Sequence, residues 1–343
     1  MKALVLAAYN RFELQERPTP EIGPDDVLLK VAACGICGSD VHGMDGSSGR
    51  RRPPIIMGHE AAGVIARLGG NVADWAEGQR VTFDSTINCG KCWFCRRGQI
   101  NLCDHREIFG VSCDECRREG AFAEYVAVPQ HILYRLPDLL SFPHAAMVEP
   151  VAVAVHAVNR TRVRLGDTAV VVGAGVIGLL LVQALRAAGC GRIIAVDLDQ
   201  KKLDLACRLG ADEALRPDQL DVAAEVMRRT AGRGADVALE AVGIPPTVQT
   251  AVACLRKGGR LTLVGLLADK VELPMQSIIT RELTVDSSYI SCGEYPACLE
   301  LMARRAIDVE LLISAVAALA DGPAWFARLH KGNEGLLKVI LKP

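Results

Sequence analysis

Aromatic residues are scarce in this chain, and so is net charge of either sign. Phe, Trp and Tyr together make up only 4% of the 343 residues, while half of all residues are hydrophobic. Val, Ala, Leu and Gly dominate, which favours an α/β protein with buried parallel strands. A formal net charge of −1 gives no support for nucleic acid or an anionic membrane surface as a partner.

Long hydrophobic runs are lacking as well. The longest run extends from Ala169 to Val182, is shorter than a membrane span requires, and contains three glycines. The apolar run that follows Met1 is brief, which is typical of a first strand and not of a signal peptide. We expect a cytoplasmic protein without a membrane partner.

The chain is longer than one ordinary domain, so the sequence predicts two. Residues 1–150 contain short alternating runs separated by Gly, Pro and Asp, which indicates a β-rich, barrel-like domain. From about residue 150, strands alternate with helices, a pattern typical of a doubly wound parallel sheet. The predicted strands lie at 27–31, 62–66, 125–128, 169–172, 192–196, 236–239, 260–264 and 337–341, and the predicted helices at 177–188, 200–209 and 296–305.

Thirteen cysteines are many, and their number is odd, but the chain is too long and too apolar for a disulfide scaffold. Four of them fall in one short stretch: Cys89, Cys92, Cys95 and Cys103. Four thiolates at this spacing predict a closed, structural zinc site. Unrelated buried or reactive cysteines are the alternative, and a zinc ribbon for nucleic acid is a further one that the balanced charge disfavours. Cys113 and Cys116 have no second pair to complete a site.

A second group of metal-binding residue types lies earlier in the chain. Cys37-Gly-Ser39-Asp40-Val-His42 is followed, after a loop, by Gly58-His59-Glu60. One cysteine, one histidine and one acid leave a coordination position open, so this group predicts a catalytic zinc.

A dinucleotide-binding loop is predicted at Gly173-Ala-Gly175-Val176-Ile177-Gly178, between a Val-rich strand and a helix. The glycines permit the tight turn, the approach of the pyrophosphate and close packing, and the helix N-terminus favours the phosphate charge. Asp197 follows at the end of the next strand. It would accept hydrogen bonds from the ribose hydroxyls and repel a 2′-phosphate, so we expect NAD.

The remaining cofactor contacts are expected after later elements. Lys202 is placed to help on the ribose, although an exposed helix face is the alternative interpretation. Val242, Val264 and Gly265 follow or end the later predicted strands and complete the expected cofactor-binding set.

Together these motifs resemble the zinc-containing medium-chain alcohol dehydrogenases, in the right order and over nearly the whole chain. The resemblance implies a GroES-like catalytic domain over 1–150 with a zinc lobe near 86–110. It also implies a Rossmann NAD-binding domain over 151–286 and a return to the catalytic domain over 287–343. Relatives are commonly tetramers, so a homotetramer or homodimer is expected.

The stretch Val148-Glu149-Pro150 looks like the sorbitol and polyol dehydrogenase branch, because simple alcohol dehydrogenases carry a cysteine ligand here. Glu149 and Glu60 compete for the third ligand position, and the sequence leaves both open. Beside the ligand Cys37, Ser39 is expected to take the alcohol proton and His42 to pass it to solvent.

The substrate is less defined than the reaction, which we expect to be oxidation of a secondary alcohol to a ketone. An arginine typical of the polyol branch is missing before Tyr289, which makes sorbitol itself doubtful. The basic loop from Ser47 to Arg52 suggests a hypothesis, contact with a phosphorylated or acidic sugar alcohol; a solvated loop or a subunit contact is the alternative. Threonine, 2,3-butanediol and plain secondary alcohols remain rival substrates. A non-enzymatic zinc- and nucleotide-binding sensor is a rival of another class, although no catalytic position is damaged.

Overall fold

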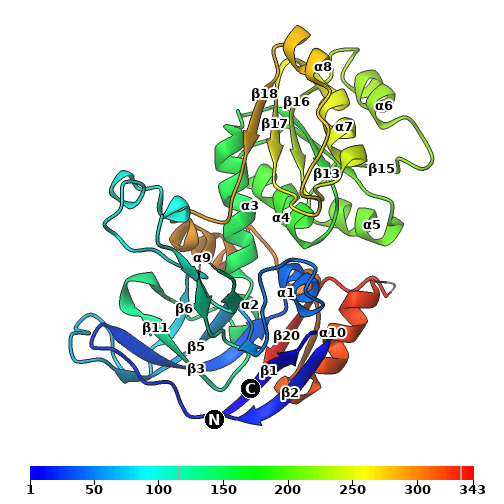
Figure 1. Ribbon diagram of the computed structural model, residues 1–343. Coiled ribbons are helices and arrows are strands. Elements are labelled where there is room, and N and C mark those ends of the chain that lie inside the picture. Colours follow the sequence, from blue (N-terminus) through cyan, green and yellow to red (C-terminus); the bar gives the residue numbers. More distant parts are fainter. Residues whose placement is uncertain (115, 333) are drawn as a thin grey trace. The chain divides into compact units, whose positions relative to one another are not determined.

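The computed structural model describes residues 1–114, 116–332 and 334–343, and the chain divides into two compact units (Figure 1). The first unit comprises Met1–Glu149, Tyr295–Ala303 and Val309–Pro343, and the second comprises Pro150–Glu294 and Arg304–Asp308. The chain thus leaves the first unit after Glu149 and returns to it with its C-terminal part.

The first unit is rich in short strands, as the sequence predicts. Its strands are β1 (Lys2–Ala8), β2 (Arg11–Glu16), β3 (Asp26–Gly35), β4 (Ile55–Ile56), β5 (Glu60–Leu68), β6 (Arg80–Phe83), β7 (Thr86–Ile87), β8 (Glu107–Ile108), β9 (Val111–Ser112), β10 (Arg117–Arg118), β11 (Tyr125–Pro129), β12 (Leu133–Arg135), β19 (Ile313–Ala318) and β20 (Lys338–Lys342). Its helices are α1 (Gly38–Met44), α2 (Phe142–Ala145), α9 (Tyr295–Ala303) and α10 (Gly322–Lys331), and its 3-10 turns are η1 (Cys95–Arg97), η2 (Ile100–Leu102), η3 (Gln130–Ile132), η4 (Glu310–Leu312) and η5 (Leu319–Asp321).

A seven-stranded sheet organises this unit, in the order β12-β6-β5-β3-β20-β19, with β11 also paired to β3. Four phenylalanines lie buried in its core, where Phe83 packs on Phe109 and Phe122 on Phe326. Aliphatic side chains fill the rest of the core, since only 4% of the chain is aromatic.

The register of β3 against its neighbours brings distant segments together. Gly35 at the end of β3 pairs with Glu60 at the start of β5 and with Ile340 of β20. A Cβ atom at Gly35 would clash with the Glu60 carboxylate, so only glycine fits there. Antiparallel pairing at this point places the residue that follows β3 beside the residue that precedes β5.

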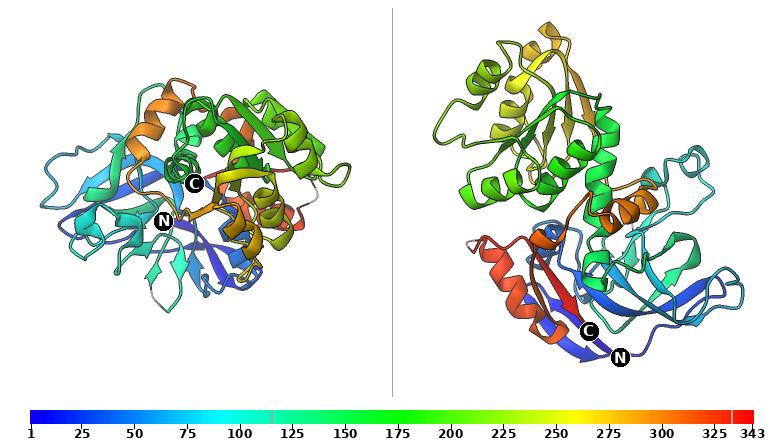
Figure 2. Two further views of the ribbon diagram at one scale, coloured as in Figure 1. Left: turned by 90° about the horizontal axis from the view of Figure 1, so that it is seen from above. Right: turned by 180° about the vertical axis from the view of Figure 1, so that it is seen from behind.

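The second unit contains a six-stranded parallel sheet in the order β15-β14-β13-β16-β17-β18. The strands are β13 (Thr168–Val172), β14 (Arg192–Val196), β15 (Glu213–Leu215), β16 (Ala235–Glu240), β17 (Leu255–Leu263) and β18 (Thr284–Ser287), and the helices are α3 (Val148–Thr161), α4 (Val176–Ala187), α5 (Gln200–Arg208), α6 (Val222–Arg229), α7 (Pro245–Cys254) and α8 (Met275–Thr280). Figure 2 shows helices on both faces of this sheet. The predicted α/β class, with a GroES-like and a Rossmann part, is confirmed.

The strand order of this sheet reverses at β13, whose neighbours are β14 on one side and β16 on the other. In open parallel sheets, ligands bind beyond the carboxyl ends of the strands at such a switch point.

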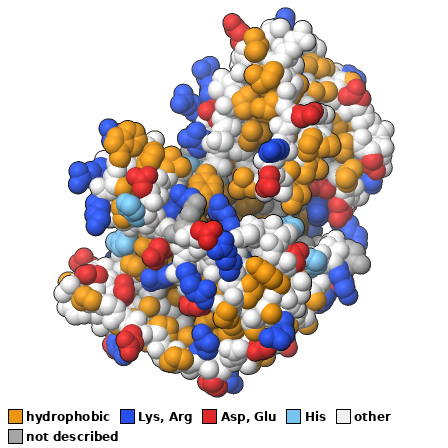
Figure 3. All heavy atoms as spheres, viewed as in Figure 1, with side chains coloured by type: hydrophobic (Ala, Val, Ile, Leu, Met, Phe, Trp, Pro, Cys, Tyr) orange, Lys and Arg blue, Asp and Glu red, His pale blue; other side chains and the backbone are white. Residues whose placement is uncertain are grey.

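The surface carries both signs of charge. In the face shown in Figure 3, basic and acidic side chains both occur on each of the two units, as expected from a net charge of −1.

Within the described residues, every helix is either too short or too polar to cross a bilayer.

Candidate active site

Cys37, His59 and Glu60 lie together at the edge where β3, β5 and β20 meet. The Cys37 sulfur, a ring nitrogen of His59 and a carboxylate oxygen of Glu60 all lie within 4.8 Å of one another. His59 and Glu60 are buried and Cys37 is half-buried. One sulfur, one nitrogen and one oxygen donor at these separations suit a tetrahedral zinc with one position left open.

Asp40 contacts two members of this cluster, His59 and Cys37. Its side chain is fully buried, Oδ1 lies 3.5 Å from His59 Nδ1, and Oδ2 accepts a hydrogen bond from the Cys37 backbone at 3.3 Å. Burial raises the pKa of Asp40, but the positive charges of His59 and Arg51 outweigh burial and hold it at about 2. A carboxylate behind one ring nitrogen fixes the tautomer and orientation of a metal-binding histidine. The sequence interpretation quoted Asp40 within the motif but gave it no role.

The surroundings of His59 shift its pKa in two opposite directions. Burial lowers its pKa, but the carboxylate of Asp40 outweighs burial and raises the pKa well above the ordinary value. Its buried Nδ1 has no hydrogen-bond partner within the described part of the chain, and Asp40 Oδ1 lies 3.5 Å away. This orphaned ring nitrogen fits a histidine whose other nitrogen binds a metal ion.

The two competing acids occupy different surroundings. Glu60 belongs to the ligand cluster, and both of its oxygens accept hydrogen bonds from buried Lys338 at 2.7 Å. Glu149 lies outside that cluster, and its Oε1 accepts a hydrogen bond from Ser85 Oγ at 3.2 Å. Burial raises the pKa of Glu149. The geometry therefore favours Glu60 over Glu149 as the direct third donor.

Ser39 and His42 lie on α1, the short helix that follows Cys37, and both side chains are exposed. Ser39 Oγ accepts a hydrogen bond from the Arg51 guanidinium at 3.4 Å. Two residue types able to carry protons thus stand on the solvent side of the Cys37 cluster, and their roles remain predictions.

Two of the three arginines of the basic loop form ion pairs with acidic side chains of the chain itself. Arg51 is buried and paired with Asp40 at 3.1 Å, and Arg52 makes a two-pronged ion pair with Asp114. These ion pairs occupy Arg51 and Arg52 inside the chain, and contact of the loop from Ser47 to Arg52 with a phosphorylated or acidic sugar alcohol stays a prediction.

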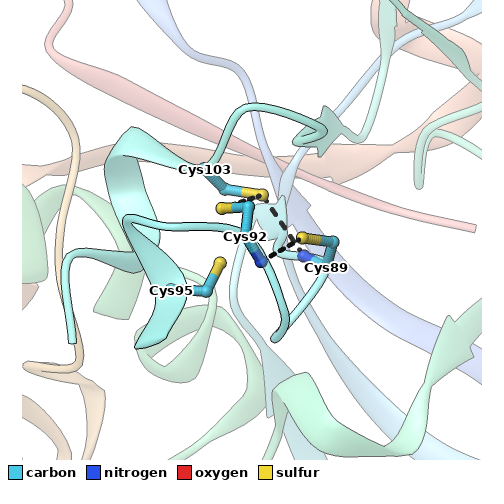
Figure 4. Close-up of side chains that lie close together, drawn as sticks. All are labelled: Cys89, Cys92, Cys95 and Cys103. Carbon is cyan, nitrogen blue, oxygen red and sulfur yellow. Dashed lines mark hydrogen bonds between the residues drawn. The ribbon is translucent and has the colours of Figure 1, made fainter. Parts of the chain in front are cut away.

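Cys89, Cys92, Cys95 and Cys103 form a second cluster around η1 and η2, with all four sulfurs within 4.8 Å of one another (Figure 4). The sulfurs of Cys92 and Cys103 are 3.9 Å apart, close to the separation of about 3.8 Å that a tetrahedral zinc with 2.3 Å bonds imposes. Backbone N–H groups donate to the sulfurs of Cys89 and Cys103. The N–H of Cys95 is the largest of the effects that lower the pKa of Cys92 to about 6. Such donors favour the thiolates of Cys89 and Cys92, while burial raises the pKa of Cys95 to about 12.

The glycine-rich loop lies at the switch point of the parallel sheet. Gly173 follows β13 with a φ of +99°, which favours glycine, and α4 begins at Val176. A Cβ atom at Gly178 would clash with the carbonyl of Gly173, so strand and helix approach closely here. The loop has the shape that brings backbone N–H groups and a helix N-terminus to a pyrophosphate.

Asp197 directly follows β14 and is tied to that loop. Its Oδ2 accepts a hydrogen bond from the Ala174 backbone at 2.7 Å, and its Oδ1 accepts one from Asp199 at 2.9 Å. Each oxygen keeps a further lone pair for a hydroxyl group. Lys202 lies half-buried on α5, the helix that follows.

Val242, Val264 and Gly265 lie together at the same edge of the sheet. The carbonyl of Glu240, the last residue of β16, accepts hydrogen bonds from the N–H groups of Val264 and Gly265. The Glu240 side chain is fully buried, and its Oε1 accepts hydrogen bonds from Val242 and Gly243. The sequence interpretation did not notice this carboxylate, which holds the loop after β16 from within.

Comparison with known proteins agrees with this geometry. The sequence matches the alcohol dehydrogenase GroES-like domain over residues 23–138 and the zinc-binding dehydrogenase family over residues 176–304. It is 34% identical over 347 residues to the sorbitol dehydrogenase of Bacillus subtilis, covering all of this chain and 97% of that protein. The chain belongs to the zinc-binding medium-chain dehydrogenases.

Two solved structures of this family differ in the cofactor that they hold. A Sinorhizobium meliloti protein bound to NADP is 34% identical, with a TM-score of 0.91 and coverage of 100% of this chain and 99% of that one. An Escherichia coli alcohol dehydrogenase in complex with NADH is 28% identical, with a TM-score of 0.92 and the same coverage. This dehydrogenase is therefore a zinc-dependent alcohol or polyol dehydrogenase, and the family alone does not fix its nicotinamide cofactor.

Proposed function

We propose that this dehydrogenase oxidises a secondary alcohol of a polyol or sugar alcohol to a ketone, with hydride transfer to NAD. The observation that carries the proposal is the cluster of Cys37, His59 and Glu60, a three-donor set with Asp40 behind the histidine. Sorbitol dehydrogenase as a relative over the whole chain supports the polyol class. The domain limits 1–150, 151–286 and 287–343 belong to the same proposal.

Cys37, His59 and Glu60 would hold the catalytic zinc, and the four-cysteine cluster would hold a structural one. Bound zinc supplies Lewis acidity that makes an alcohol hydroxyl more acidic. Asp40 keeps the His59 ring oriented, and Ser85 holds Glu149 nearby as an outer acid.

Ser39 is proposed to accept the proton of the alcohol, and His42, three residues along α1, to pass it to solvent. The Arg51 guanidinium can only donate hydrogen bonds, so Ser39 Oγ must accept the one between them. The hydroxyl hydrogen of Ser39 thus points elsewhere, which suits a group that receives one proton and hands on another.

NAD is proposed over NADP on the strength of Asp197. Its charge lies at the end of β14 and is fixed to the glycine loop by the Ala174 N–H. A carboxylate held there accepts hydrogen bonds from ribose hydroxyls and repels a 2′-phosphate. Lys202 is the proposed neighbour of the same ribose.

The proposal is tested by initial rates with NAD on a panel of polyols, sugar acids, threonine, 2,3-butanediol and plain secondary alcohols. A polyol or sugar alcohol should give the highest kcat/KM. Turnover of threonine or butanediol alone would replace the substrate class but keep the reaction. Absence of turnover on every alcohol, in protein with both zinc sites filled, would favour a non-enzymatic sensor.

A homodimer or homotetramer is proposed as well. Large apolar side chains stand exposed near the edge strand β18 of the second unit: Leu266, Leu267, Leu273, Met275 and Ile279. Exposed apolar patches of this kind are typical of protein interfaces. Sedimentation analysis of the purified protein tests the assembly, and a monomer at micromolar concentration would contradict it.

A further inference from the structure

Arg51 is a buried charge that the proposed chemistry does not yet use. Its side chain is 4% exposed, although it comes from a loop with arginines on either side. The aliphatic stem packs against Gly43 of α1, where any Cβ atom would clash with it. A buried guanidinium is costly unless its charge is compensated, so its partners indicate what it is there for.

Besides the Arg50 carbonyl, which accepts from one terminal nitrogen at 3.4 Å, the partners of the guanidinium are two neighbouring residues of the Cys37 motif. The other terminal nitrogen of Arg51 donates to Asp40 Oδ1 at 3.1 Å and to Ser39 Oγ at 3.4 Å. The same Oδ1 of Asp40 lies 3.5 Å from His59 Nδ1, and Oδ2 accepts from the Cys37 backbone. One arginine therefore contacts the carboxylate that touches two proposed zinc ligands.

The backbone around Arg51 is anchored to a strand of the first unit. The residues before and after it hydrogen-bond to Ser112 of β9, through Ser112 N to Arg50 O at 3.0 Å and Arg52 N to Ser112 O at 3.1 Å. The side chain of Arg52 is paired with Asp114 just beyond that strand. The guanidinium thus has a fixed support and is not the end of a free loop.

Among the described residues, removal of Arg51 would leave His59 as the cationic partner of the buried Asp40 carboxylate. When that histidine binds zinc it is neutral, so the arginine is then the group that balances the charge of Asp40. Without it, Asp40 would have to turn away from His59, take up water or a proton, or destabilise the site.

We propose that Arg51 is a positioning residue of the catalytic metal site, holding Asp40 in the orientation that fixes His59 and the Cys37 backbone. The proposal rests on the assignment of Cys37 and His59 as zinc ligands. Through its second contact Arg51 also holds Ser39 in place for proton transfer. Arg51 and Arg52 then have different roles: Arg51 supports the metal site, whereas Arg52 forms an ion pair with Asp114 at the surface.

The test compares Arg51→Ala with Arg52→Ala, a neighbouring arginine whose pair with Asp114 lies at the surface. Zinc retained per chain is measured against a graded series of a competing chelator, and the four-cysteine zinc serves as the internal reference. Loss of a group that orients a metal ligand typically weakens metal affinity 10–100-fold. We expect Arg51→Ala to weaken zinc binding at the Cys37 site by about that factor, while Arg52→Ala stays within about twofold of wild type.

Two further variants separate positioning from mere folding stability. Asp40→Asn removes the carboxylate alone and leaves the Arg51 guanidinium without its ion-pair partner, whereas Asp40→Asn/Arg51→Ala removes both charges together. If Arg51 acts through Asp40, the double variant should bind zinc no more weakly than Asp40→Asn. Arg51→Lys should fall between wild type and Arg51→Ala, because it keeps the charge but loses the planar donors.

Several outcomes would overturn the proposal. Wild-type zinc affinity in Arg51→Ala, with or without a loss of thermal stability, would make Arg51 a structural ion pair only. A further tenfold loss on adding Arg51→Ala to Asp40→Asn would exclude the route through Asp40. Either outcome concerns Arg51 alone. The proposed function would still hold as long as the wild-type protein binds zinc at Cys37 and oxidises an alcohol. If the wild-type protein bound no zinc at Cys37, the proposed function and the role of Arg51 would both be overturned.

Discussion

Lys338 donates to both carboxylate oxygens of Glu60 at 2.7 Å, and both side chains are buried. The lysine comes from β20, the last strand of the chain, while Glu60 opens β5. Burial lowers the pKa of Lys338, but the charge of Glu60 outweighs burial and raises it. Glu60, the acid proposed to bind zinc, therefore also forms an ion pair with Lys338 of the C-terminal strand.

Replacing Lys338 with Met should destabilise the protein, and the loss should depend on zinc. Breaking a buried ion pair leaves an uncompensated charge and typically costs about 3–5 kcal/mol. If Glu60 reaches the metal, bound zinc would compensate part of that charge. The free energy of unfolding in urea, measured for Lys338→Met in wild-type and Cys37→Ser backgrounds, should show a smaller penalty where the catalytic zinc is present.

Lys342→Met, at the exposed end of the same strand, serves as the control for Lys338→Met and should change little. An equal penalty for Lys338→Met in both backgrounds would indicate that Glu60 does not bind the metal and would favour Glu149.

Asp197→Ala should relax the preference for NAD. The carboxylate is the proposed source of repulsion toward a 2′-phosphate, and removal of one such interaction of about 1.4 kcal/mol shifts a ratio tenfold. The ratio of kcat/KM for NADP to that for NAD should rise at least about tenfold, with zinc content unchanged. Asp199→Ala, the nearby N-cap of α5, is the matched control. An unchanged cofactor ratio in Asp197→Ala would remove the argument for NAD.

Cys92→Ser should harm stability and leave the chemistry of the remaining folded protein intact. The loss of one thiolate opens the four-sulfur site, and binding free energy of a structural zinc is folding free energy. Zinc should fall from two to one per chain, and Tm should fall by about 10 °C. Cys207→Ser, an exposed cysteine on α5, should alter neither quantity. Full zinc content in Cys92→Ser would contradict the structural site.

Low pH should lower the free energy of unfolding of the second unit, because Asp236 becomes protonated. Burial raises the pKa of this carboxyl, but hydrogen bonds from Arg256 at 2.7 Å and from the Thr168 N–H outweigh burial and lower it. Because the folded-state pKa lies below the usual value near 3.8, the stabilisation is complete above that value and disappears as pH falls through the lower one.

The stability difference between wild type and Asp236→Asn should therefore be constant from pH 7 to about pH 5 and shrink toward pH 3. Urea unfolding at a series of pH values measures it, with Asp218→Asn at an exposed pair as control. A difference that stays constant down to pH 3 would show that Asp236 gains nothing from its charge.

Local patterns were enough to predict much of the fold. The strand over 192–196 has the predicted limits, and the helix predicted over 177–188 is shifted by one residue at each end. These segments carry their own periodicity and turn residues, so their structure depends little on distant contacts. Helix α10 and strand β19 were missed because their patterns are weak without the sheet against which they pack.

The sequence predicted the metal ligands of the site but not the residues that support them. Cys37 and His59 stand in short motifs with ligand chemistry, so spacing alone drew attention to them. Arg51, Lys338 and Ser85 carry no such signal, because their partners are defined by strand register and not by sequence neighbours. Asp40 could have been found: an acid in the first turn after a proposed ligand cysteine is a natural orienting group for a metal-binding histidine.

The most direct test of the whole account is the zinc content and polyol turnover of Cys37→Ser, measured on the same preparation. The account predicts one zinc per chain, an unchanged dissociation constant for NAD, and a loss of kcat of at least about a thousandfold. Turnover near the wild-type rate in protein that has lost the zinc at Cys37 would contradict it.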